Sequence, residues 1–309
     1  MNVKDLDRLI SKLEVEAEKT RADSEVFGRL DRLKEQAATY KGEDEVVSFE
    51  EVVQRVKTQE EAFKIMTGWE NFDKIIQGFR PQQVVVVSAL TKSGKTQWCM
   101  DLTARIGAYS PLWLPFEESA EELLRKCVER GVEPPRGFTP NIMRGGELSW
   151  VESKIVEGIV KYDSKIVFID HLDFLVPFGA DNHALRVAET MRTIKGFAKK
   201  WGVCIVLICH LTKVKMDTVP TLEDLRGSSA IGQEADTAII LWRETKRSRT
   251  EVTVTNNTIV SIQANRRHGS TGNVTMVYDG KVYREEEWRE DIINSDRVNN
   301  DFINFGKTS

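Results

Sequence analysis

The stretch that decides the fold is VVVVSALTKSGKTQWCM, residues 84–100. It opens with a continuous apolar run, which is typical of a strand buried on both faces of a parallel sheet. Ser93, Gly94, Lys95 and Thr96 follow this run at the head of a predicted helix, the context in which they form a phosphate-binding loop. Backbone N–H groups there would hold phosphate oxygens, Lys95 would reach the β- and γ-phosphates, and the Thr96 hydroxyl would hold Mg²⁺.

The composition is that of an ordinary globular protein. The 309 residues give room for one α/β domain and a smaller appendage, and the net charge of −4 argues against a surface that coats nucleic acid. A few basic residues lining a pore could still hold a strand. No run approaches the ~20 apolar residues that span a bilayer, and the N-terminus lacks the apolar core of a signal peptide. We expect a cytoplasmic protein, in a bacterial cell or a phage-infected host, with no membrane partner.

The four cysteines suggest buried thiols. None of them forms a Cys-x-x-Cys pair, and Cys204 and Cys209 lie within the apolar run GVCIVLICH. Small buried thiols are common in such runs. The sequence therefore predicts neither a disulfide framework nor a zinc site.

Three regions differ in their sequence texture. Residues 1–65 carry apolar side chains at helical spacing and no strand-like run, which predicts a small helical arm. Within it, Ser48 and Glu51 have the spacing of a capping box at the start of a short helix. The arm could pack on its own domain or on a neighbouring subunit, and both remain open. Residues 286–309 form an acidic tail, which is more often disordered than not.

Residues 66–285 alternate between apolar runs and amphipathic helical segments. This alternation predicts right-handed βαβ crossovers and a mostly parallel sheet flanked by helices. After residue 249 the segments become β-rich with turns, so we expect antiparallel strands that extend one edge of the sheet.

Polar side chains stand where three other predicted strands end. Asp170 ends KIVFID and could hold a water bound to Mg²⁺, and Glu117 follows PLWLPF, where a carboxylate can act as a general base. The neighbouring Glu118 is better explained as a residue of the next helix's first turn. His210 ends GVCIVLICH and could sense the γ-phosphate. These residues predict an Mg-ATP or Mg-GTP site.

The order of these motifs resembles the RecA-like hexameric helicases of the DnaB type, and most closely the helicase part of bacteriophage primase–helicases. The resemblance covers roughly residues 66–285. It is carried by the segments TGWENFDKIIQGFRP, SALTKSGKT, PFEES, IVFIDHLDFL, IKGFAKKWGVCIVLICHLTK, DLRGSSAIGQEADTAIILWR and ANRRHGSTG. The first glycine of the phosphate loop is often missing in this group, so Ala89 agrees with the resemblance. It implies a RecA-like nucleotide-hydrolysing core.

The resemblance also implies roles for individual residues. Glu117 would be the catalytic base and Asp170 the ligand of the Mg²⁺-bound water. Arg243 and Tyr278 fall where the family holds the nucleotide base. The segment NRRHG falls where the arginine finger of a neighbouring subunit lies; Arg267 is favoured by the DnaB pattern and Arg266 by the phage pattern. Residues in the loop after His210 would face single-stranded DNA: Lys213, Lys215, Arg226 and Gly227.

We therefore expect an ATP-dependent ring helicase, most simply a homohexamer, that moves 5′→3′ on single-stranded DNA and unwinds duplex during replication. ATP, or another NTP or dNTP, with Mg²⁺ would be its nucleotide, and a separate primase, polymerase or single-strand-binding protein its further partner. Two alternatives remain: a RecA-like recombinase, which would form open filaments, and a loader-type ATPase that binds DNA without unwinding it. The segments ICHL and NRRHGSTG argue against the recombinase.

Overall fold

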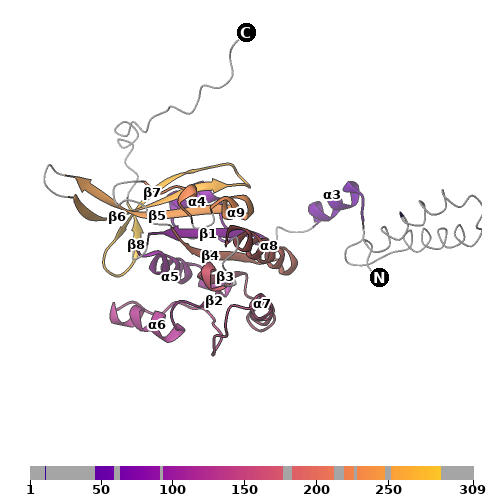
Figure 1. Cartoon of the computed structure of the whole chain (residues 1–309), viewed down its shortest axis with the longest axis horizontal. Helices are drawn as coiled ribbons and strands as arrows, with labels where there is room; N and C mark the ends of the chain where they lie inside the picture. The colour runs from indigo at the N-terminus through magenta and orange to yellow at the C-terminus, as the bar shows by residue number, and fades with distance from the viewer. Residues whose placement is uncertain are drawn as a thin grey trace, which may run out of the picture. The chain divides into compact units, whose positions relative to one another are not determined.

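The computed structural model describes residues 46–58, 63–90, 93–176, 183–211, 219–225, 228–247 and 252–286, together with Ser11. The chain divides into two units, Met1–Glu61 and Ala62–Ser309. Helix α3 (Phe49–Thr58) belongs to the first unit, and the other described elements belong to the second (Figure 1). Ile65, expected at the end of the arm, forms a bridge with Phe79 and so lies in the second unit.

Helix α3 begins where the capping residues predict. The Glu51 N–H donates to Ser48 Oγ at 3.2 Å, and that hydroxyl donates to Glu51 Oε1 at 3.3 Å. The serine therefore satisfies one of the N–H groups that the first turn leaves without a helical partner. The short helix expected here is confirmed.

Five parallel strands form one side of an eight-stranded sheet, in the order β2-β3-β4-β1-β5 from one edge inward. Their bounds are Leu112–Pro115 (β2), Ile166–Asp170 (β3), Cys204–His210 (β4), Val84–Ala89 (β1) and Thr237–Arg247 (β5). All six residues of β1 are buried, because strands lie on both sides of it and helices cover both faces. The expected mostly parallel sheet is confirmed.

Three antiparallel strands extend the β5 edge. They are β6 (Val252–Asn265), β7 (Gly272–Tyr278) and β8 (Tyr283–Glu285), paired in sequence order. Hairpin connections suffice here because each strand reverses the direction of the one before it. The antiparallel extension predicted after residue 249 is confirmed.

Two apolar cores lie on the two faces of the sheet, and the alternation of side chains along β1 assigns its residues to them. Val85 and Val87 belong to one core, and Val84 and Val86 belong to the other. The first core is covered by α4 (Glu70–Ile76), α5 (Lys95–Arg105) and α6 (Ala120–Glu129). The second is covered by α7 (Leu148–Tyr162), α8 (His183–Trp201) and α9 (Ser228–Glu234). Short 3-10 turns span Gly107–Tyr109 (η1), Leu172–Phe174 (η2) and Leu222–Asp224 (η3).

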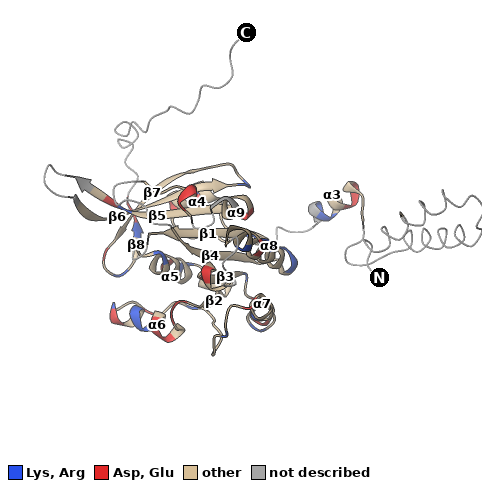
Figure 2. Ribbon diagram, in the orientation of Figure 1, with Lys and Arg blue, Asp and Glu red and all other residues tan. Residues whose placement is uncertain are grey.

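The surface carries both signs of charge, interspersed over the described helices (Figure 2). All four cysteines are buried and free, and burial raises the pKa of the Cys99, Cys204 and Cys209 thiols. Within the described residues, no helix combines the length and the apolar character that crossing a bilayer would require.

Candidate nucleotide-hydrolysis site

The candidate site lies at the carboxyl edge of the parallel strands. Because β1 to β4 run in the same direction, the residues that follow them converge at one edge. Lys95 Nζ lies 3.5 Å from Glu117 Oε2, and the Thr96 hydroxyl donates to Asp170 Oδ2 at 2.9 Å. His210 Nε2 lies 3.7 Å from the same glutamate oxygen. Predicted positions that are far apart in sequence are thus brought together.

The phosphate loop ends at a left-handed glycine. Gly94 caps α5 with φ 85°, a conformation that favours glycine. A Cβ atom at this position would lie 2.4 Å from the Tyr283 hydroxyl, so a side chain there would require Tyr283 to move. Ser93 lies just before it, and its N–H donates to the Leu90 carbonyl at 3.0 Å. Lys95 is buried, with 7% exposure, as expected of a lysine whose charge a bound phosphate would balance.

The residues fit a magnesium ion next to Thr96. Asp170 is 3% exposed, and its Oδ1 has no hydrogen-bond partner among the described residues. Burial raises the pKa of Asp170, while Lys95 and the hydrogen bond from Thr96 act in the opposite direction. A hydroxyl and a buried carboxylate oxygen are the hard donors that Mg²⁺ takes, usually with several waters retained.

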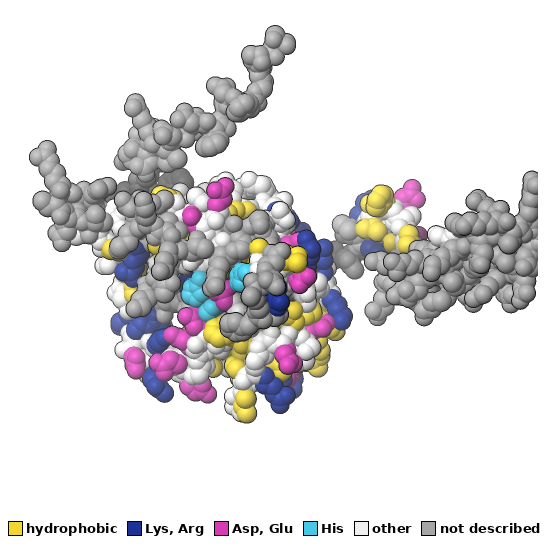
Figure 3. Space-filling view, viewed as in Figure 1, with side chains coloured by type: hydrophobic (Ala, Val, Ile, Leu, Met, Phe, Trp, Pro, Cys, Tyr) yellow, Lys and Arg dark blue, Asp and Glu magenta, His cyan; other side chains and the backbone are white. Residues whose placement is uncertain are grey.

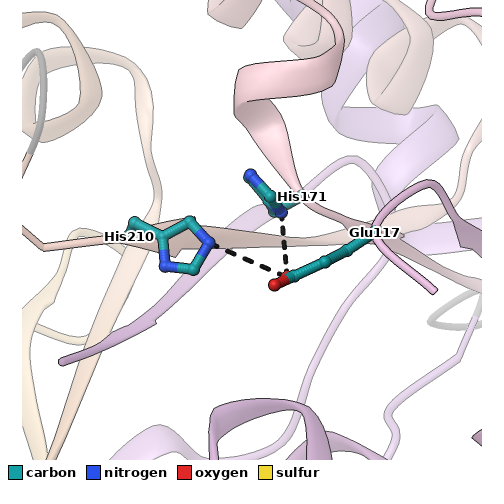
Figure 4. A group of neighbouring side chains, drawn as sticks. All are labelled: Glu117, His171 and His210. Carbon is teal, nitrogen blue, oxygen red and sulfur yellow. Dashed lines mark hydrogen bonds and ion pairs between the residues drawn. The ribbon is translucent and has the colours of Figure 1, made fainter. Parts of the chain in front are cut away.

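Glu117 is surrounded by groups that favour its ionised form. Its Oε2 lies 3.0 Å from His171 Nδ1 and 3.7 Å from His210 Nε2 (Figure 4), in addition to the contact with Lys95 described above. Partial burial would raise the pKa of Glu117, but Lys95 and the two histidines outweigh burial and lower it. Burial, Lys95 and His171 lower the pKa of His210. At neutral pH Glu117 is therefore a carboxylate, as a general base requires.

One carboxylate and two imidazoles also form a set that could ligate a transition metal. The ligating atoms of Glu117, His171 and His210 lie within 4.8 Å of one another. However, the Lys95 ammonium lies 3.5 Å from the shared glutamate oxygen and would repel a divalent cation there. Figure 3 shows histidine side chains beside an acidic one on the face viewed. We interpret the set as a proton-transfer site.

Arg243 and Tyr278 lie near the same edge, on the antiparallel side. Arg243 is opposite Thr258 across the β5–β6 pair, and its Nε is buried with no hydrogen-bond partner among the described residues. The Tyr278 hydroxyl donates to the Gly280 carbonyl at 3.0 Å and lies 3.3 Å from the Arg130 guanidinium. The Tyr278 hydroxyl is thus held by hydrogen bonds with residues of its own chain.

The two arginines of the NRRHG segment lie at the opposite edge. β6 ends at Asn265, which pairs with Thr237, the first residue of β5. The Arg266 guanidinium donates to the carbonyls of Gly232, at 3.2 Å, and Gln233 at the end of α9. The Arg267 side chain is exposed. Neither arginine is brought to the phosphate loop of its own chain.

The predicted DNA-facing residues, Lys213, Lys215, Arg226 and Gly227, lie outside the described residues. Two described residues flank them: Leu211, directly after His210, forms an antiparallel bridge with Leu225. The segment between them therefore starts and finishes close to His210.

Sequence reasoning missed three residues of this region. His171 directly follows Asp170 in IDHLDFL, and its position next to a predicted metal ligand could have marked it as a residue of the site. The Arg130 guanidinium contacts the Tyr278 hydroxyl, and the Tyr283 hydroxyl lies over Gly94. Nothing in the local sequence marks these two, because tertiary contacts alone bring them to the site.

Comparison with known proteins bears on this geometry. The family model described as DnaB-like helicase C terminal domain matches residues 146–287. Over those residues the chain is similar to this family. It is 23% identical over 257 residues to the replicative DNA helicase DnaB of Haemophilus influenzae, covering 71% of this chain and 54% of that protein. The replicative DNA helicase DnaC of Bacillus subtilis is 23% identical over 248 residues, covering 69% and 54%. The chain thus spans about half the length of these relatives.

Two solved structures share the fold. One, described as an ATPase domain, superposes with a TM-score of 0.65 at 18% identity, covering 78% of this chain and 100% of that one. A DnaB-like replicative helicase, described with its interactions with primase, gives a TM-score of 0.65 at 17% identity, covering 90% and 76%. The RecA-like fold class expected from the motifs is confirmed. The DnaB-like match includes Asp170, His171 and His210, and the geometry joins Lys95 and Glu117 to them.

Proposed function

We propose that this DnaB-like protein hydrolyses ATP and uses the energy to move along single-stranded DNA and unwind duplex during replication. The observation that carries the proposal is the convergence of Lys95 and His210 within 3.7 Å of Glu117 Oε2, beside the Thr96–Asp170 pair. Lys95 balances the charge of the phosphates, and Glu117 orients a water and accepts its proton as the water attacks.

Thr96 and Asp170 would hold Mg²⁺, which supplies charge neutralisation at the β- and γ-phosphates when bound. Arg243 and Tyr278 are proposed to border the nucleotide base. His210 ends β4 directly before the Leu211–Leu225 bridge. This position supports the proposal that it responds to the γ-phosphate and passes the change to the following loop.

We infer that the site is completed by a second copy of the chain. Arg267 is exposed at the sheet edge opposite to the phosphate loop, too far to reach its own site, and a head-to-tail ring would present it to the next subunit. Arg266, bonded to the end of α9, is the weaker choice for the finger. A homohexameric ring is the assembly proposed, with the helical arm as a further contact.

The loop after His210 is proposed to hold DNA in the ring channel, through the lysines Lys213 and Lys215 and through Arg226 and Gly227. We propose 5′→3′ movement and a cytoplasmic site of action. A separate primase is the partner suggested by the solved relative that interacts with one. A polymerase or single-strand-binding protein is a further partner proposed for the acidic tail.

The test compares Glu117→Gln with Glu118→Gln. Both changes remove one carboxylate from neighbouring positions, but Glu118 pairs with Lys126 at the surface, 2.5 Å away. We expect Glu117→Gln to lower the DNA-stimulated kcat for ATP by ~10²–10⁴-fold, the usual contribution of a general base, and Glu118→Gln to change it less than about twofold. Unwinding of a forked duplex would be lost only with the first.

Other outcomes separate the alternatives. An ATPase rate that ignores both single-stranded DNA and Glu117 would contradict the proposal. Open filaments on DNA, seen by electron microscopy in place of closed rings, would indicate a recombinase. Hydrolysis coupled to DNA binding without fork unwinding would indicate a loader.

A further inference from the structure

His171 is the nearest charged or titratable neighbour of the proposed base among the described residues. Its Nδ1 lies 3.0 Å from Glu117 Oε2, nearer than Lys95 Nζ at 3.5 Å or His210 Nε2 at 3.7 Å. We propose that His171 is a positioning residue that fixes the Glu117 carboxylate for hydrolysis. This proposal rests on the ATPase function proposed above.

The imidazole is itself held on several sides. Its ring packs edge-on against Phe174 at 4.8 Å between centroids and against His210 at 4.3 Å. Its Nε2 lies 3.8 Å from Asp173 Oδ2, on the side away from Glu117. The His171 side chain is only 9% exposed. An imidazole packed in this way keeps Nδ1 directed at the glutamate.

The backbone couples the same two positions. The Asp170 carbonyl accepts hydrogen bonds from the N–H groups of Phe116 and Glu117, at 2.7 and 3.0 Å. Asp170, the proposed metal ligand, and His171, which follows it, therefore fix both the main chain and the carboxylate of Glu117. A general base needs such fixing, because small displacements from the attacking water cost large factors in rate.

The other two neighbours of Glu117 cannot replace this contact. Lys95 is proposed to turn to the phosphates when nucleotide is bound, and His210 to respond to the γ-phosphate. The Lys95 and His210 side chains would therefore move away from the Glu117 carboxylate when ATP is hydrolysed. His171 alone has no proposed duty towards the nucleotide, so its contact can persist through the cycle.

The experiment compares His171→Asn with His171→Gln in the full-length protein. The Asn amide nitrogen takes the place of Nδ1 and can donate to Glu117, whereas the Gln amide lies one bond further out, nearer the place of Nε2. Both replacements are polar and of similar size. We expect kcat for ATP, measured with saturating single-stranded DNA, to fall less than about fivefold in His171→Asn and roughly 10–100-fold in His171→Gln. KM and the affinity for ATPγS would change less than about threefold in both.

A double-mutant cycle adds a readout that a purely structural role would not give. In the Glu117→Gln background, His171→Gln is expected to change the remaining rate less than about twofold, because the group that it positions is absent. Equal rates for the Asn and Gln variants, or a full further loss in the Glu117→Gln background, would overturn the proposal. A wild-type protein without ATPase activity would instead overturn the proposed function.

Discussion

Asp101 is a carboxylate on which burial and hydrogen bonding act in opposite directions. Its Oδ2 accepts from the Tyr283 N–H at 2.7 Å, and its Oδ1 accepts from the Gln97 amide at 2.6 Å. Burial is the larger effect and raises the pKa of Asp101 to about 6. Asp101 on helix α5 thus holds the backbone of Tyr283 on strand β8, and the Tyr283 hydroxyl lies over Gly94. Together the two residues link helix α5, strand β8 and the phosphate loop.

The raised pKa predicts a pH-dependent stability. An unfolded aspartate has a pKa of about 3.9, so the folded state binds this proton more tightly than the unfolded chain. The resulting contribution to the free energy of unfolding is full below pH ~4 and is lost as the pH rises through about 6. The stability lost between about pH 4 and neutral pH amounts to at most ~3 kcal/mol.

Asp101→Asn removes this titration. We expect the difference in Tm between the variant and wild type to shift in favour of the variant by a few degrees between about pH 4.5 and about pH 7.5. Asp163→Asn is the control, because it makes the same substitution in a side chain that is 77% exposed. A difference in Tm that stays constant with pH for Asp101→Asn would contradict the assignment.

At the scale of elements, the turn η2 supports the side chains that surround the proposed base, Glu117. It directly follows His171, and the Phe174 ring within it packs against both His171 and Phe116. Gly146, in the connection before α7, lies against the backbone of this turn: a Cβ atom there would fall 1.9 Å from the Phe174 carbonyl oxygen. At the neighbouring Gly145, an added Cβ atom would have nothing within 4 Å.

This contrast gives a matched pair of variants. Gly146→Ala must displace η2 and is expected to lower the free energy of unfolding by about 1–3 kcal/mol, the usual cost of overpacking. It should also lower kcat, because the displaced turn carries the ring that packs on His171. Gly145→Ala is expected to change the free energy of unfolding by less than about 0.5 kcal/mol. Denaturant unfolding and ATPase rates measure both effects, and equal behaviour of the two variants would show that η2 does not pack as described.

At the scale of the whole molecule, the sheet separates the two halves of the proposed site. The groups that bind phosphate and activate water lie at the carboxyl edge of the parallel strands. The exposed Arg267 lies beyond β6, at the edge where β5 begins. In the proposed ring, two copies of the chain arranged head to tail would bring these edges together.

Mixing two inactive variants tests this arrangement. Glu117→Gln and Arg267→Ala should each lose most DNA-stimulated ATPase activity, since a finger of this kind contributes ~10³–10⁵ in rate. In an equal mixture that exchanges subunits, about a quarter of the interfaces would combine an intact Glu117 with an intact Arg267. We expect activity to recover towards that fraction. No recovery after exchange, confirmed with labelled subunits, would place the finger in the same chain or at another residue.

Much of the site could be predicted because its residues follow strands. A buried strand needs a continuous apolar run, so the ends of β1, β2, β3 and β4 are visible in the sequence. Parallel strands place those ends at one edge, so the sequence alone predicts that Lys95, Glu117, Asp170 and His210 lie close together, as they do. The antiparallel extension and the helix at Ser48 were predicted for equally local reasons.

The contacts across the sheet were decided by the tertiary structure alone. The approach of His171 to Glu117, of Tyr283 to Gly94 and of Gly146 to Phe174 depends on how loops pack once the strands are in register. Local patterns specify the period and the ends of an element, because these follow from backbone geometry and solvent exposure. They do not specify which distant side chain fills the space next to a catalytic group, because that space exists only after the chain has folded.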